Sequence, residues 1–101
     1  MITFAKFSEI LEQTAALSVD DRKKTSDEII LRQAIVAEFD AVSLYEQMSR
    51  SAKNPRVKKL LLDIAQEEKV HIGELEGMLE TLDPEHKPST ADGRKEMKNV
   101  K

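Results

Sequence analysis

Two long amphipathic stretches, separated by a helix-breaking signal, constrain the fold more than any other feature of the sequence. Residues 25–51 and 54–82 carry apolar side chains three or four positions apart, which is the spacing of one face of an α-helix. Between them, "SAKNP" ends one helix and begins the next, because Asn54 is a favourable N-cap and Pro55 a favourable first helical residue. So short a connection predicts an antiparallel helical hairpin.

The segments on either side of the hairpin are expected to be shorter or less ordered. Thr25 and Glu28 match a capping box, which predicts that the first hairpin helix begins near Thr25. The apolar pattern also predicts a short N-terminal helix over residues 3–17, too short to be stable alone, which docks on the hairpin or on a neighbouring subunit. The predicted organisation is an N-terminal helix and linker (1–24), a hairpin (25–83) and a polar, flexible C-terminal tail (84–101).

Composition excludes several classes of function. The chain has 101 residues, which fits one small domain, and no cysteine, so it offers no disulfide, thiol nucleophile or Cys-ligated metal. The sequence has no basic stripe with interleaved aromatics, so it does not indicate nucleic acid as a partner. No apolar run approaches the roughly 20 residues of a membrane span. The first residues lack the pattern of a secretory signal, so we expect a cytoplasmic protein.

Three polar residues interrupt the apolar faces of the hairpin. Glu38 lies in the face of the first helix, and Glu68 and His71 lie in that of the second. At i and i+3, the latter two differ by about 60° in azimuth and about 4.5 Å in rise. Mid-helix positions of an antiparallel pair fall at one level, so the three side chains are expected to converge. A buried carboxylate is costly unless a cation compensates its charge. The alternative is that all three are solvated edge residues.

The predicted ligand set amounts to half of a known kind of metal site. Carboxylates and imidazole without sulfur suit iron or manganese. Di-iron four-helix bundles take a Glu from each of two helices and a Glu-x-x-His from each of the other two. This chain supplies one of each, and a two-fold axis through the site would supply the rest while covering the open apolar face. We therefore expect an all-α fold in which two subunits pair into a four-helix bundle with two irons at their interface.

A family resemblance rests on "AIVAEFDAVSLYEQM" and "KKLLLDIAQEEKVHIGELEGMLETLDPE". Over about residues 29–85 the chain resembles encapsulated ferritins, the half-ferritins carried as cargo by encapsulin nanocompartments, including an E-x(6)-Y element and the E-x-x-H. The resemblance implies a ferritin-like fold with a ferroxidase centre between two subunits. It implies Glu38, Glu68 and His71 as iron ligands, with Tyr45 beside them. It also implies homodimers assembled into a larger ring, commonly a decamer, and a location inside an encapsulin nanocompartment in the cytoplasm.

Two features depart from the family pattern, and rival functions stay open. An acidic pair that serves metal uptake in some members reads Ala37 and Asp40 here, so only half of it is present, and "GRKEMKNVK" is only weakly similar to shell-targeting peptides. The expected function is a ferroxidase that converts Fe(II) to Fe(III), with O2 or peroxide as oxidant, for iron storage or detoxification with an encapsulin shell. One alternative is a rubrerythrin-like di-iron peroxidase, although its usual partner domain needs cysteines that this chain lacks. The other is a non-catalytic helical interaction module.

Overall fold

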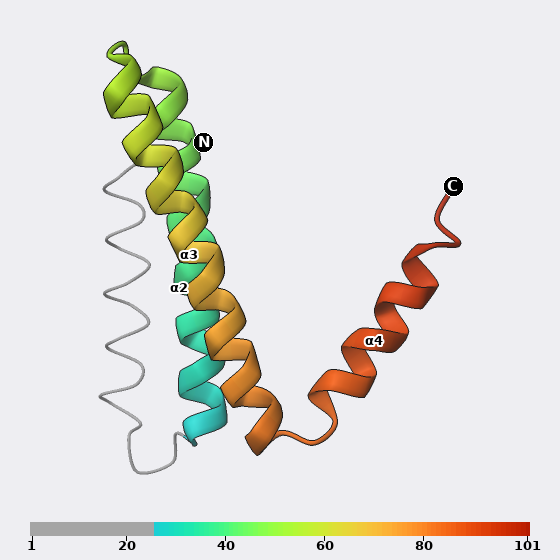
Figure 1. Cartoon of the computed structure of the whole chain (residues 1–101). Coiled ribbons are helices and arrows are strands. Elements are labelled where there is room, and N and C mark those ends of the chain that lie inside the picture. The colour runs from blue at the N-terminus through green and yellow to red at the C-terminus, as the bar shows by residue number, and fades with distance from the viewer. Residues whose placement is uncertain (1–25) are drawn as a thin grey trace.

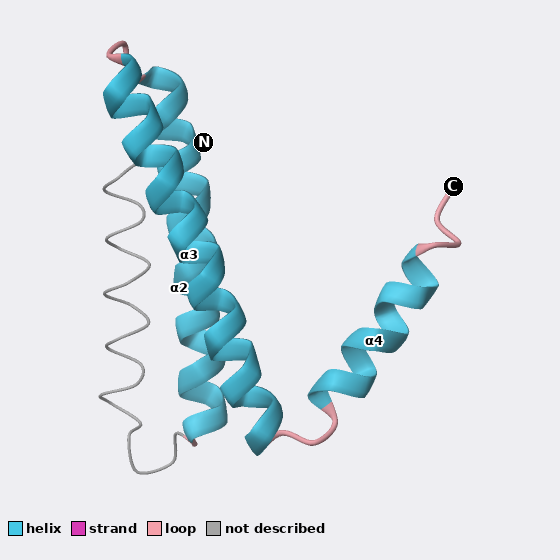
Figure 2. Ribbon diagram, viewed as in Figure 1, coloured by secondary structure: helices cyan, strands magenta, loops and turns pink. Residues whose placement is uncertain are grey.

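The computed structural model describes residues 26–101, which form three helices: α2 (Asp27–Ser51), α3 (Pro55–Leu82) and α4 (His86–Met97) (Figure 1). This part of the chain contains no strand, so the predicted all-α class is confirmed (Figure 2). The predicted N-terminal helix over residues 3–17 and the linker to residue 24 lie outside the described residues. Within residues 26–101, no helix has the length and apolar character needed to cross a membrane.

The N-cap of the first hairpin helix lies one residue later than predicted. Ser26 is the N-cap of α2, and its hydroxyl oxygen accepts a hydrogen bond from the backbone N–H of Ile29 at 3.3 Å. Glu28 is therefore the second helical residue instead of the third, so the capping box predicted from Thr25 is wrong by one position. Serine and threonine cap helices comparably well, and two adjacent candidates cannot be separated by their side-chain chemistry.

The start of α3 agrees with the prediction. Asn54 is the N-cap, and its Oδ1 accepts hydrogen bonds from the backbone N–H groups of Arg56 at 2.8 Å and Val57 at 3.4 Å. Pro55 occupies the first helical position, where a missing N–H costs nothing because that group would have no partner inside the helix. The two helices are consequently joined by a short connection and lie side by side in opposite directions (Figure 1).

Two ion pairs between the helices record their antiparallel register. The guanidinium of Arg32 lies 2.8 Å from the carboxylate of Asp83, and the ammonium of Lys69 lies 3.6 Å from the carboxylate of Glu46. Fourteen residues separate Arg32 from Glu46 on the α2 side, and fourteen separate Lys69 from Asp83 on the other. Equal steps in opposite directions are what an antiparallel pair requires.

Burial decreases across three neighbouring stripes of α3, each with seven-residue spacing and each about 60° from the next. The first stripe is buried, with Leu79 fully inaccessible: Ala65, Ile72 and Leu79. The second is half-buried apart from its last member, which is 41% exposed: Leu61, Glu68, Leu75 and Leu82. The third is mostly exposed: Val57, Ile64, His71 and Met78. The apolar face of α3 thus extends beyond the part that packs in the hairpin.

Helix α4 occupies most of the range for which the sequence predicted a flexible tail. It follows α3 after a short link, projects away from the hairpin (Figures 1 and 2) and buries no residue. Pro88 is tolerated because it lies in the first turn, where backbone N–H groups lack partners inside the helix. The last turns contain strong helix formers, among them Arg94, Lys95 and Met97. The sequence did not predict this helix, and the predicted mobility of the segment stays a prediction.

Candidate metal centre

The hairpin brings together the three polar residues that interrupt its apolar faces. Glu38 is the twelfth of the 25 residues of α2, and Glu68 is the fourteenth of the 28 residues of α3. His71 follows one turn after Glu68 on the same side of α3. One ligand atom from each of the three side chains lies within 4.8 Å of the others. The expected convergence is therefore present, and the role of these residues as metal ligands stays a prediction.

The imidazole of His71 faces both carboxylates. Its Nδ1 atom lies 3.5 Å from Oε2 of Glu68 and 3.6 Å from Oε2 of Glu38. The two glutamate side chains are mostly enclosed, with 18% and 25% of their surface exposed, whereas that of His71 is 49% exposed. The cluster therefore lies at the edge of the hairpin, where the buried part of α3 gives way to its exposed stripe.

One oxygen of the cluster has no hydrogen-bond partner in the described part of the chain. Oε2 of Glu38 is buried from solvent and accepts no hydrogen bond. An ionised carboxylate only accepts hydrogen bonds, so burying one of its oxygens without a donor is unfavourable. A divalent cation among the three side chains would compensate for this loss. Two carboxylates and an imidazole are a donor set that iron and manganese accept, so the residues present fit a metal ion.

The other predicted site residue lies near the cluster without joining it. Tyr45 is on the face of α2 that carries Glu38, two turns further along, and it is half-buried. Its hydroxyl makes no hydrogen bond to either glutamate or to the histidine, so the place in the iron site that the resemblance implies for Tyr45 stays a prediction. Asp40, the acidic member of the two positions that read Ala37 and Asp40, is also half-buried on α2 and lies outside the cluster.

Sequence reasoning did not identify the two ion pairs that flank the cluster. Glu46 and Lys69 join the helices on the side toward the connection, and Arg32 and Asp83 join them at the opposite end of the hairpin. Pairs between helices can be predicted only once the register is known. The available signal was the equal fourteen-residue step between opposite charges on the two helices. The pairs join α2 and α3 in the same antiparallel hairpin that brings Glu38 close to Glu68 and His71.

Comparisons with known proteins agree with this arrangement. The family model described as Rubrerythrin matches residues 30–100, a range that contains Glu38, Tyr45, Glu68 and His71. A "Ferritin-like-encapsulin shell fusion protein" of Pyrococcus furiosus is 46% identical over 82 residues. That alignment covers 79% of this chain and 24% of the relative, so the chain spans about a quarter of the relative's length. No solved structure matches the chain.

The two matches confirm the resemblance to ferritin-like proteins that the sequence motifs indicated. The family model extends over most of the chain, across both hairpin helices and most of the C-terminal segment. The relative carries the same kind of ferritin-like region within a longer protein. The chain belongs to the rubrerythrin family of ferritin-like helical proteins.

Proposed function

We propose that the protein is a ferroxidase, which oxidises Fe(II) to Fe(III) at a di-iron centre assembled from two copies of the chain. The observation that carries the proposal is the cluster of Glu38, Glu68 and His71, whose ligand atoms lie within 4.8 Å of one another. The buried oxygen of Glu38 supports it, because this oxygen has no hydrogen-bond donor and a cation would compensate its charge. Membership of the rubrerythrin family supports redox chemistry in general.

The exposure of the cluster favours a centre shared by two copies, and its charge fits one divalent ion for each copy. With a neutral imidazole, one copy supplies the charge of two carboxylates, which balances a single divalent ion. Two copies supply four carboxylates and two imidazoles, which balance two Fe(II) ions. The exposed stripe beside the cluster includes Val57 and Met78, 44% and 56% exposed. Burying such a side chain contributes about 1–2 kcal/mol, so a second hairpin would cover this face and complete the ligand set together.

The proposed reaction treats iron as the substrate. Two Fe(II) ions each lose one electron, and one O2 takes both electrons with two protons and leaves as hydrogen peroxide. With peroxide as oxidant, the same two electrons and two protons yield two waters. The carboxylates of Glu38 and Glu68 favour this change because their negative charge stabilises Fe(III) more than Fe(II). Nδ1 of His71, facing both carboxylates, would keep the ions at the hairpin edge, where the oxidant has access.

The direct test is the rate of Fe(II) oxidation, followed by absorbance of the ferric product. We expect Glu38→Ala, Glu68→Ala and His71→Ala each to lower the rate by about tenfold or more, because each removes a ligand of the proposed centre. Glu67→Ala is the matched control, since Glu67 precedes Glu68 on α3 and is exposed; it should retain the wild-type rate. Wild-type rates in all three ligand variants would refute the proposal.

We also propose that the protein works together with an encapsulin shell, inside which the ferric product would be stored. The support is the 46% identical relative, whose name describes a ferritin-like protein fused to an encapsulin shell. Co-expression with an encapsulin shell protein, followed by purification of assembled shells, tests the association. Shells that contain none of this chain would count against it.

The rubrerythrin match favours a second candidate, a di-iron peroxidase. It would use the same ligands, so site variants do not separate it from a ferroxidase. The oxidant does: anaerobic protein loaded with Fe(II) is mixed with O2 or with hydrogen peroxide, and the two rates are compared. Faster reaction with O2 supports the ferroxidase, and reaction with peroxide alone supports the peroxidase. A non-catalytic helical module would bind no iron in metal analysis of the purified protein.

A further inference from the structure

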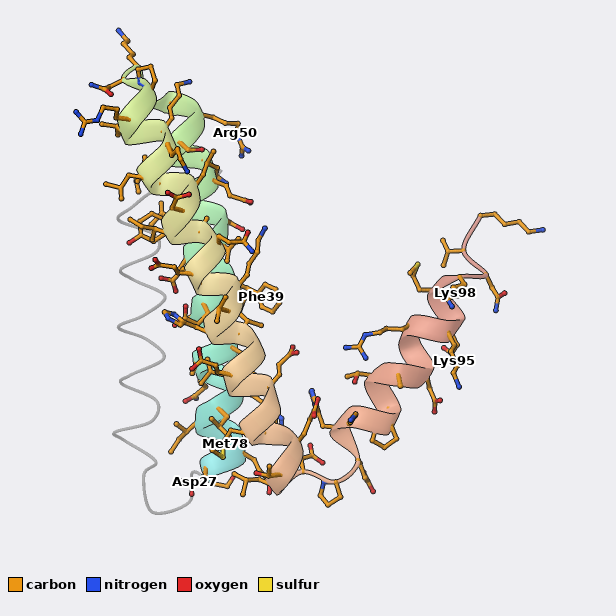
Figure 3. The ribbon with its side chains drawn as sticks, viewed as in Figure 1. Asp27, Phe39, Arg50, Met78, Lys95 and Lys98 are labelled. Atoms are coloured by element: carbon orange, nitrogen blue, oxygen red, sulfur yellow. The ribbon has the colours of Figure 1, made fainter. Side chains whose placement is uncertain are left out.

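The two ends of the hairpin carry opposite charge. Around the connection between α2 and α3, residues 47–62 contain five cations and no carboxylate; these cations, here called the basic tip, are Arg50, Lys53, Arg56, Lys58 and Lys59. Figure 3 shows Arg50 near this tip, with Asp27 and Met78 at the opposite end of the hairpin. Lys59 already pairs with Asp63 at 3.1 Å, so the other four carry most of the uncompensated charge.

The opposite end of the hairpin, where α2 begins and α3 ends, is acidic. Residues 26–32 and 74–85 contain one cation and seven carboxylates; these carboxylates, here called the acidic end, are Asp27, Glu28, Glu74, Glu76, Glu80, Asp83 and Glu85. The cation, Arg32, pairs with Asp83 at 2.8 Å and approaches Glu28 at 3.9 Å. Most of the acidic charge is therefore uncompensated within the hairpin.

The position of the candidate metal centre relates the two charged ends to each other. Glu68 is the fourteenth of the 28 residues of α3, so both ends of that helix lie about 20 Å from it. A two-fold axis through the centre, perpendicular to the helices, therefore places the basic tip of one copy beside the acidic end of the other. It does so twice, once at each end. Parallel pairing would instead place cations beside cations and carboxylates beside carboxylates.

We propose that the basic tip and the acidic end form a complementary contact between two copies of the chain. This contact selects the antiparallel pairing and makes assembly of the shared centre depend on ionic strength. The inference rests on the proposed function, because it takes the second copy as the occupant of the exposed face. Complementary charge accelerates association and disfavours wrong pairings, and both effects weaken as salt shortens the range of the field.

Charge reversal tests the contact, with dimerisation followed by analytical ultracentrifugation in the presence of Mn(II), a divalent ion that O2 does not consume. The tip variant is Arg50→Glu, Lys53→Glu and Arg56→Glu, and the end variant is Glu74→Lys, Glu76→Lys and Glu80→Lys. We expect each to weaken dimerisation by about tenfold at low salt. The combined variant, with both ends reversed, should recover most of the wild-type affinity because tip and end are complementary again.

The end variant also controls for total charge. The wild-type net charge is −3, and three Glu→Lys changes raise it to +3, which has the same magnitude. A weaker dimer in this variant therefore reflects lost complementarity and not a larger net repulsion. Reversal of the tip without any effect on dimerisation would overturn the inference and would indicate that the tip serves a different anionic partner. Failure of the combined variant to recover, with helical content retained by circular dichroism, would also overturn it.

The orientation can be measured directly because the chain has no cysteine. A single cysteine placed by Lys53→Cys carries a spin label at the tip, and one placed by Glu85→Cys carries a label at the acidic end. Antiparallel dimers should give a tip-to-tip distance of about 40 Å, and mixed samples should show a much shorter tip-to-end distance. Short tip-to-tip distances would contradict the inference. If dimers oxidise iron but neither salt nor charge reversal changes their affinity, the inference fails and the proposed function stands. If the protein never dimerises, the proposed function itself loses its basis.

Discussion

Nδ1 of His71, on α3, lies 3.6 Å from Oε2 of Glu38, on α2. This contact joins the two helices of the hairpin at the candidate metal centre. The carboxylate oxygen is buried and has no hydrogen-bond donor, while the imidazole is half exposed. The pair therefore leaves an acceptor without its donor at the edge of the hairpin, where a cation could bind.

Glu38→Gln should separate folding from metal binding. The amide keeps the shape of the side chain but removes the charge of a carboxylate whose buried oxygen has no hydrogen-bond donor. We therefore expect the unfolding temperature of metal-free protein to be unchanged or higher. We also expect the stabilisation that Mn(II) gives the wild type to disappear. Thermal circular dichroism with and without Mn(II) measures both.

Glu46→Gln is a poor control because Glu46 pairs with Lys69, so Glu67→Gln serves instead. Equal Mn(II) stabilisation of Glu38→Gln and the wild type would contradict the assignment.

Neighbouring residues of α3 should respond differently to truncation. Leu79 is fully buried, so Leu79→Ala should lower the free energy of unfolding by about 2–5 kcal/mol. Met78 is 56% exposed in the single chain, so Met78→Ala should change monomer stability by less than about 1 kcal/mol while weakening dimerisation. Chemical denaturation at low protein concentration measures the first effect, and sedimentation at higher concentration the second. A stable dimer of Met78→Ala would argue against the exposed stripe as the pairing face.

The ion pair between Arg32 and Asp83 should contribute modestly. Its partners are 48% and 21% exposed, so we expect a coupling of about 0.5–1 kcal/mol that decreases with added salt. The measurement is a double-mutant cycle of Arg32→Gln and Asp83→Asn by chemical denaturation. Asparagine keeps an Oδ1 atom for the hydrogen bond that Asp83 accepts from the backbone N–H of Glu85. A coupling near zero at low salt would mean that packing alone aligns this end of the hairpin.

Helix α4 should exchange its amide hydrogens much faster than α3. It buries no residue and has only its own helical hydrogen bonds, so local opening exposes little apolar surface. Hydrogen exchange with mass spectrometry should show near-complete exchange in α4 while the middle of α3 is still protected. Protection of α4 that appears only when an encapsulin shell protein is added would identify it as a segment that orders on a partner. Equal protection of α3 and α4 in the isolated protein would contradict the predicted mobility.

Sequence reasoning succeeded where one residue type decides the outcome and failed where neighbours compete. Asn54 and Pro55 fix the start of α3 because no adjacent residue could serve as well. Ser26 was missed as the cap of α2 because Thr25 offers the same chemistry one position earlier. The convergence of Glu38 and Glu68 could be predicted from their mid-helix levels. The burial of one oxygen of Glu38 could not, because it depends on side-chain packing across the hairpin.

The seven-residue stripes of α3 have a consequence for how two chains find the correct alignment. Apolar residues recur at the same spacing along each stripe, so a partner displaced by one repeat, about 10 Å, would meet nearly the same surface. Hydrophobic contact alone therefore gives the aligned pair and the displaced pair nearly the same free energy of association. Glu68 and His71 are the polar members of their stripes, and displacement would bury them against apolar side chains. The residues proposed to bind iron would thus also prevent misaligned pairs, even before any metal arrives.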